Sequence, residues 1–75
     1  MTYAEMFAEL GAARASLFLS SDLVTFEAME VFRERKGAID AALVYGRLEI
    51  REGLVEETDE LSAQALARYR TASAA

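Results

Sequence analysis

The side chains in this sequence that could carry out chemistry are carboxylates and guanidiniums, because it contains no histidine and no cysteine. Nucleophilic catalysis generally needs His, Cys or an activated Lys beside a carboxylate. The single lysine, Lys36, stands beside Arg33 and Arg35, a setting typical of a solvated helix surface. We therefore expect no catalytic residue, and we expect that the protein is not an enzyme.

Two groups of carboxylates invite comparison with metal sites. Glu27, Glu30 and Glu34 share one face of a helix, and a short acidic run occupies positions 56–60. Di-iron bundles typically place a His three residues after a Glu, and EF-hands alternate oxygen ligands around a glycine; the sequence has neither pattern. The glycines are scattered singly, so there is no phosphate-binding loop. We expect no metal and no cofactor, and we interpret the three glutamates as a solvated acidic face.

Positive charges gather on one margin of the same stretch, at Arg33, Lys36, Arg47 and Arg51. A nucleic acid would use such a ridge, yet the net charge is −5 and no aromatic residues alternate with these side chains for base stacking. Charged flanks of a helix-packing seam, which set register and partner choice in coiled coils, account for them better. We expect no direct contact with nucleic acid.

Length and composition favour a small folded unit that associates with other chains. The 75 residues make one domain at most, and 53 % of them are hydrophobic, which is too many for a disordered tail. A chain this short buries a small core, and without cysteine no disulfide can reinforce it. No apolar run approaches the ~20 residues of a membrane span, and Glu5 and Glu9 stand where a secretory signal carries positive charge. These features favour a cytoplasmic protein with no membrane span.

The first helix is predicted over residues 3–19. Thr2 and Glu5 match a capping box, in which each side chain covers a free backbone N–H group at the start of a helix. Ser20 and Ser21 are good N-cap residues that follow the apolar face of this helix. The chain is expected to turn there into a helical hairpin.

A long second helix is predicted over residues 22–57. Its apolar stripe stays in phase, and we expect an interaction surface along this stripe and its continuation, at Phe32, Ile39, Leu43, Ile50, Leu54 and Leu61. Gly37, Gly46 and Gly53 argue against an uninterrupted helix, and segment 43–55 has enough β-branched and aromatic character for a short β-hairpin instead. The unbroken stripe favours the helix. Gly46 and Gly53 lie on one edge of it, where they either admit a closely packed helix or mark a kink.

A third helix is predicted over residues 59–71, capped by Thr58, and residues 72–75 should fray. The stripe of the long helix continues into this segment, so the sequence leaves open whether the third helix bends away or continues the second. There is no internal repeat and no linker. The expected fold is all-α: one small domain over residues 1–75, a helical hairpin with a long second helix and a short third helical segment.

The predicted lengths indicate that this hairpin leaves part of its stripe open. A helix over 3–19 spans roughly 25 Å and one over 22–57 roughly 54 Å, so the first covers about half of the second. The outer apolar positions, including Phe26, Val44 and Leu48, should also stay open. Exposed contiguous apolar surface usually marks an interface. We therefore expect oligomerisation, most simply an antiparallel dimer, to complete a helical bundle.

These features predict a non-enzymatic protein–protein interaction module: a small self-associating helical protein, structural, assembly or regulatory in role, that docks on a larger protein. One alternative is an acidic inhibitor or nucleic-acid mimic, of the kind that phages and mobile elements encode, whose carboxylates block a basic groove. Another is a small non-catalytic subunit or assembly chaperone of an enzyme complex. The sequence names no partner beyond a second copy of itself.

Overall fold

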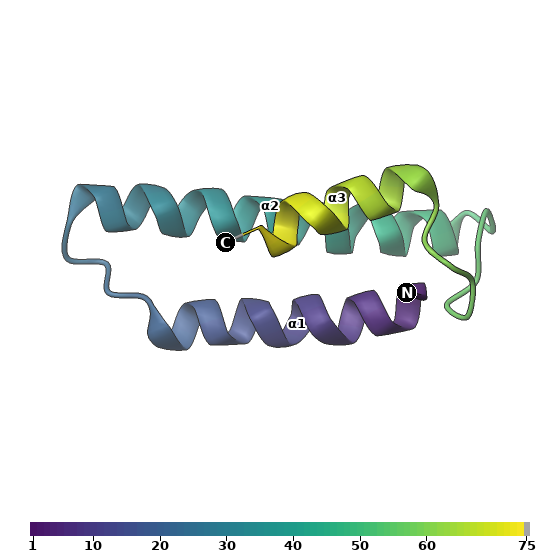
Figure 1. Cartoon of the computed structure of the whole chain (residues 1–75), viewed down its shortest axis with the longest axis horizontal. Coiled ribbons are helices and arrows are strands. Elements are labelled where there is room, and N and C mark those ends of the chain that lie inside the picture. The colour runs from purple at the N-terminus through teal and green to yellow at the C-terminus, as the bar shows by residue number, and fades with distance from the viewer. Residues whose placement is uncertain (75) are drawn as a thin grey trace.

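In the computed structural model, which describes residues 1–74, the chain forms three helices: α1 (Tyr3–Ser20), α2 (Phe26–Arg51) and α3 (Ala63–Ser73) (Figure 1). α1 and α2 run antiparallel, joined by residues 21–25. α3 folds back along the C-terminal half of α2 and ends near the middle of the molecule. The predicted all-α class is confirmed. The molecule is elongated, 42 × 19 × 18 Å, and its surface is therefore large relative to the volume of its core.

The start of α1 is a capping box, as predicted. The Thr2 hydroxyl accepts a hydrogen bond from the backbone N–H of Glu5 at 3.2 Å, and the Glu5 carboxylate accepts one from the N–H of Thr2 at 2.9 Å. Hydrogen bonding by the Thr2 backbone and then by the Thr2 side chain lowers the pKa of the Glu5 carboxyl below its ordinary value. The local sequence thus determines where this helix begins.

α2 is shorter at both ends than the predicted helix over 22–57. It begins after Thr25, whose side chain accepts a hydrogen bond from the N–H of Ala28 at 3.0 Å and caps the first turn. It ends just before Gly53, whose φ of 76° is left-handed and cannot continue the helix. The chain is helical up to this turn, so the alternative β-hairpin is wrong. Apolar periodicity continued past both ends and therefore concealed the two caps.

Segment 52–62 covers the start of α1 instead of forming helix. The carbonyl groups of Asp59 and Glu57 accept hydrogen bonds from the N–H groups of Tyr3 at 3.1 Å and Ala4 at 3.0 Å. Those two N–H groups have no acceptor within their own helix, because they belong to its first turn. The segment therefore keeps a non-helical conformation that satisfies another element.

α3 starts and ends later than the predicted helix over 59–71. It begins after Ser62, whose hydroxyl accepts a hydrogen bond from the N–H of Ala65 at 3.1 Å. The predicted frayed tail is wrong over its first residues, since Ala72 lies in the helix and is buried. Ala75 lies outside the residues that the structure describes.

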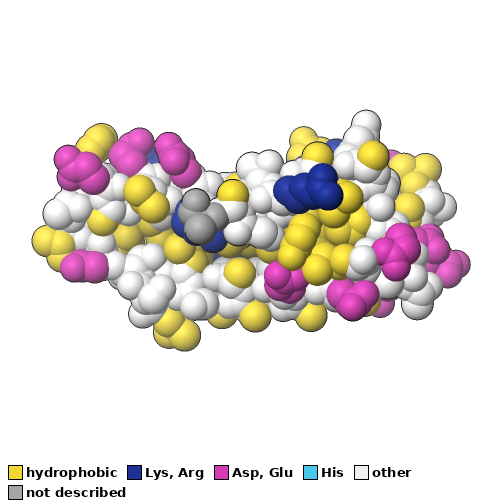
Figure 2. All heavy atoms as spheres, viewed as in Figure 1, with side chains coloured by type: hydrophobic (Ala, Val, Ile, Leu, Met, Phe, Trp, Pro, Cys, Tyr) yellow, Lys and Arg dark blue, Asp and Glu magenta, His cyan; other side chains and the backbone are white. Residues whose placement is uncertain are grey.

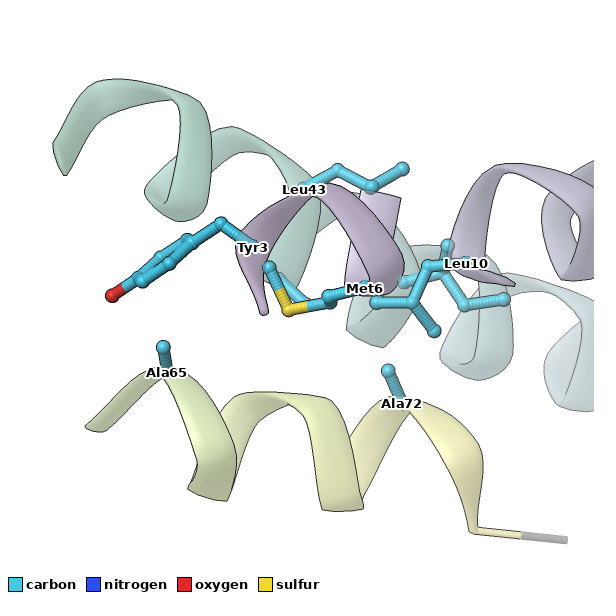
Figure 3. Packing of buried hydrophobic residues seen from close by; sticks show 8 residues of the cluster. Tyr3, Met6, Leu10, Leu43, Ala65 and Ala72 are labelled. Atoms are coloured by element: carbon cyan, nitrogen blue, oxygen red, sulfur yellow. The ribbon is translucent and has the colours of Figure 1, made fainter. Parts of the chain in front are cut away.

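The core lies where all three helices meet. Its buried hydrophobic residues are Tyr3, Met6, Leu10, Ile39, Ala42, Leu43, Ala65 and Ala72. In Figure 3 the side chains of Tyr3, Met6 and Leu10 lie between α1, α2 and α3. Several core residues are alanines, so the helices approach closely but bury little apolar volume.

α1 packs closely on α2 at Gly46. A Cβ atom there would lie 2.8 Å from Phe7 Cε1 and 2.9 Å from Met6 Cε, closer than ordinary van der Waals contact. Of the two interpretations of this glycine, close packing of a neighbouring helix is therefore the correct one. The helix that packs on it is α1 of the same chain.

Candidate protein-interaction surface

α3 covers only half of α2. With 11 residues it spans about 16 Å, whereas the 26 residues of α2 span about 39 Å. Its end is held at Arg35, whose guanidinium donates a hydrogen bond to the carbonyl of Ala74. The N-terminal part of the α2 ribbon has α1 beside it and lies beyond the end of α3 (Figure 1). One end of the molecule is thus a pair of helices without a third.

A groove continues the line of α3 over this end. It consists of two adjoining depressions that share Val31, one beside the end of α3 and one reaching the α1–α2 connection. We call it the open groove. Its apolar floor consists of Leu17, Ala28, Val31 and Phe32. Its rim carries three carboxylates, those of Asp22, Glu27 and Glu34, and one guanidinium, that of Arg35 beside the end of α3.

Large hydrophobic side chains are exposed around the same end, at Phe18, Leu19, Leu23, Val24, Phe26, Met29 and Val31. Figure 2 shows hydrophobic and acidic side chains side by side there, at the left of the view. The accessible surface of the molecule is 5075 Å², against about 4,600 Å² for an average monomer of 8.3 kDa. Exposed apolar side chains gathered at one end of a molecule usually mark an interaction site.

The predicted acidic face divides between two sides of α2. Glu27 and Glu34 border the open groove, whereas Glu30 lies outside its lining. The Glu30 carboxylate is 3.6 Å from the guanidinium of Arg33, one turn along the helix. The groove therefore has an acidic rim, and the other side of α2 has mixed charge.

The basic margin contains one local ion-pair network. Lys36 Nζ lies 2.8 Å from Asp40 Oδ2, and Arg14 Nε of α1 lies 2.7 Å from Asp40 Oδ1. Hydrogen bonds from Lys36 and then from Arg14 hold the pKa of Asp40 below its ordinary value. Lys36, the only lysine, is thus paired within α2 with the carboxylate that Arg14 links to α1.

The other three basic side chains, those of Arg33, Arg47 and Arg51, are exposed. Arg47 and Arg51 border a shallow depression on the outer face of α2 together with Val44 and Leu48. Both of these apolar side chains are exposed, as predicted for the outer apolar positions of the helix. Apolar and basic groups therefore share one patch near the C-terminal end of α2.

The predicted interaction stripe is divided between core and surface. Ile39 and Leu43 are buried in the core, Phe32, Ile50 and Leu61 are half-buried, and Leu54 is 70 % exposed. The expected half-coverage of α2 by α1 is wrong, because α2 is shorter than predicted. Contacts between α1 and α2 extend from the Phe18–Phe32 ring pair, with centroids 5.0 Å apart, to a hydrogen bond between Tyr3 and Glu49. Most of the stripe therefore packs within the chain.

The sequence patterns did not predict Val31 as a site residue, although it is the residue common to both depressions of the open groove. It stands off the apolar stripe, four residues after Glu27 and three before Glu34. Residues at these spacings are neighbours on a helix surface. An apolar residue within an acidic face is the signal that could have identified it.

Within residues 1–74, no group of three or more His, Cys, Asp or Glu side chains is placed to hold a metal ion. No helix in that part of the chain combines the length and apolar character needed to cross a bilayer. No known protein family, curated protein or solved structure matches the chain. Functional inference therefore rests on the geometry and charge of its surface.

Proposed function

We propose that this protein is a non-enzymatic protein–protein interaction module that self-associates and docks on a larger protein through its open groove. The observation that carries the proposal is the position of the groove, which continues the path of α3 over the half of α2 that α3 leaves uncovered. Two packed helices bury their apolar faces best when a third helix lies in the groove between them. A helix of the partner would complete the bundle at this end, as α3 does at the other.

The dimensions and lining of the groove fit an amphipathic helix. The uncovered part of α2, from Phe26 to Arg35, is about 15 Å long, enough for nearly three helical turns. The apolar floor suits side chains at i, i+3, i+4 and i+7 of the incoming helix. Val31 and Ala28 line the middle of this floor, and Val31 is 56 % exposed without a partner.

The acidic rim indicates the charge of that helix. The carboxylates of Asp22, Glu27 and Glu34 border the groove, so lysines or arginines beside the apolar stripe of the partner would meet opposite charge. Acidic flanks would meet like charge. The proposed ligand is therefore a basic amphipathic helix of a larger protein.

The residue inventory supports a binding role over catalysis. The full sequence has neither histidine nor cysteine, and its one lysine shares Asp40 with Arg14. General acid–base and nucleophilic catalysis depend most often on those residue types. The carboxylates on the groove rim serve a binding role through charge alone.

A synthetic helical peptide provides the test, with leucine and alanine in an apolar stripe and lysines on both flanks. We expect saturable binding by fluorescence anisotropy and NMR shift changes at the amides of Ala28 and Val31. Val31→Glu should weaken binding about tenfold or more, because docking would bury an unpaired charge. Val44→Glu is the matched control, since Val44 is also an exposed valine of α2, at 58 %. The control should bind the peptide like the parent protein.

Two results would contradict the groove proposal. Equal effects of the two valine substitutions would show that the peptide senses only net charge. Equally tight binding of an isomer with its apolar stripe scrambled would show that no helix face is recognised. Such a charge-only response, with affinity falling steeply as salt is raised, would instead support the acidic-inhibitor alternative.

A further inference from the structure

A strip along the outer side of α2, which borders α1 at Asp40 and Arg47, carries a second regular pattern. From Phe26 to Arg51, residues on this face follow alternating spacings of four and three: Phe26, Glu30, Arg33, Gly37, Asp40, Val44, Arg47 and Arg51. This is the spacing of the a and d positions of a coiled coil. Ordinary coiled-coil seams are apolar, whereas this one alternates charged, apolar and small residues.

The pattern lies on accessible surface. Phe26 is 73 % exposed, and the Arg33 side chain is 75 % exposed. Met29 and Leu48, which flank the pattern, are also exposed. Near its C-terminal end, Val44, Arg47 and Arg51 border a shallow depression. Toward α1 the face is partly engaged: half-buried Asp40 is paired with Arg14 of α1, and the Arg47 guanidinium lies over the Phe7 ring. Its outer positions, Phe26, Arg33 and Val44, are exposed and free to meet another helix.

We infer that a second copy of the chain packs on this face, α2 against α2 and antiparallel, with Glu30 of each copy opposite Arg47 of the other. The inference rests on the self-association in the proposed function and specifies its geometry. In an antiparallel coiled coil, a residues of one helix share layers with d residues of the other. When Glu30 is aligned with Arg47, the remaining layers follow: Phe26 with Arg51, Arg33 with Val44, and Gly37 with Asp40.

Each of these layers joins compatible groups. Glu30 and Arg47 have opposite charge, and the guanidinium of Arg51 can lie over the ring of Phe26. The aliphatic stem of Arg33 can cover Val44 while its charged head stays in water. In the central layers, Gly37 has no side chain and no other atom within 4 Å of where a Cβ would stand, so the helices can approach closely.

Charge selects the antiparallel arrangement over the parallel one. In a parallel, in-register pair each residue faces its own counterpart, so Glu30, Arg33, Asp40, Arg47 and Arg51 would each meet the same charge. Like charges across an interface disfavour that arrangement. The antiparallel alignment has no layer with like charges.

The open groove and this face do not compete. The groove is lined by Glu27, Val31 and Glu34, which lie on the side of α2 toward α3. Val44 and Arg47 border a different depression, and the Arg47 guanidinium extends over the Phe7 ring of α1, away from the groove. A dimer could therefore present two grooves, one per copy, to a larger partner.

Charge exchange tests the alignment by sedimentation velocity at micromolar concentrations. Glu30→Arg and Arg47→Glu should each weaken dimerisation about tenfold, and the double variant should regain most of the loss, since the pair is restored with reversed sign. Glu34→Arg makes the same change of charge on the groove side and should leave dimerisation unchanged. Circular dichroism should show unchanged helix content in all variants.

Cysteine cross-linking tests the orientation separately, since the chain has no cysteine of its own. A chain with both Arg33→Cys and Val44→Cys should form a covalent dimer under mild oxidation. Either substitution alone should not, because in the antiparallel pair each position lies about 16 Å along the axis from its own counterpart. A disulfide needs Cα atoms within about 7 Å.

The outcomes separate the alignment from self-association as such. A dimer that ignores the charge exchange, or that cross-links through either single cysteine, overturns the antiparallel α2 pairing and leaves self-association standing. A parent protein that stays monomeric throughout overturns both. The peptide assay on the open groove is unaffected by either result.

Discussion

The hydroxyl of Tyr3, a side chain with no exposed surface, donates a 2.5 Å hydrogen bond to Glu49 Oε2. This bond joins the first turn of α1 to the end of α2. The other oxygen of the Glu49 carboxylate accepts a hydrogen bond of 3.0 Å from Arg68 of α3. One half-buried carboxylate thus holds all three helices together at the end of the molecule opposite the open groove.

We expect Tyr3→Phe to lower the free energy of unfolding by about 1.5–3 kcal/mol, the usual range for a hydrogen bond to a charged group. Urea unfolding followed by circular dichroism would measure the change. Tyr45→Phe is the control, because Tyr45 is exposed and its ring can still lie under Arg68. Equal losses in the two variants would show that the Tyr3–Glu49 bond contributes nothing specific.

The contact at Gly46 predicts opposite effects for two glycine-to-alanine substitutions. Gly11→Ala adds a methyl group where no other atom lies within 4 Å, so it should stabilise the protein by about 0.5–1 kcal/mol. Gly46→Ala should offset this gain or reverse it, because its Cβ would press on Phe7 and Met6. Melting temperatures would reveal the difference. A rise of the same size in both variants would contradict the close helix packing.

Gly53 should tolerate substitution poorly for a different reason. Its φ of 76° is left-handed, and a Cβ atom there costs roughly 1–2 kcal/mol whatever space surrounds it. We expect Gly53→Ala to lower the unfolding free energy by about 1 kcal/mol and Gly53→Asn to lower it less, because asparagine adopts this conformation more readily. Parallel urea titrations would rank the two variants. The opposite ranking would indicate that the turn is not the cause.

Asp40 should make the free energy of unfolding decrease as the pH falls into the acid range. Its folded pKa is lowered by Lys36 and Arg14, so its contribution is present above its unfolded pKa and is lost as pH falls through the folded value. At neutral pH, Asp40→Asn should cost about 1 kcal/mol or less, since these ion pairs are partly exposed. The deficit of the variant should shrink between about pH 5 and pH 2. The free energy of unfolding of both proteins, measured across this pH range, provides the test. A deficit that stays constant with pH would exclude the ion pairs as its cause.

Local patterns in the sequence determined most of the secondary structure. The Thr2 capping box set the start of α1, because its donors and acceptors lie within four consecutive residues. The exposure of Val44 and Leu48 also followed from the sequence, since helical periodicity places them opposite the apolar stripe. Periodicity reports which side of a helix is apolar, and it does so wherever the helix lies in the fold.

Only the tertiary structure decided that the segment before α3 is not helical and which surface stays open. The residues before α3 are non-helical because the carbonyls of Glu57 and Asp59 bond to the start of α1, more than fifty positions earlier in the chain. The open groove exists because α3 ends beside Arg35 of α2. Val31, one turn earlier in α2, therefore has no third helix beside it. Both features depend on which elements lie side by side, and hydrophobic spacing within one helix carries no information about its neighbours.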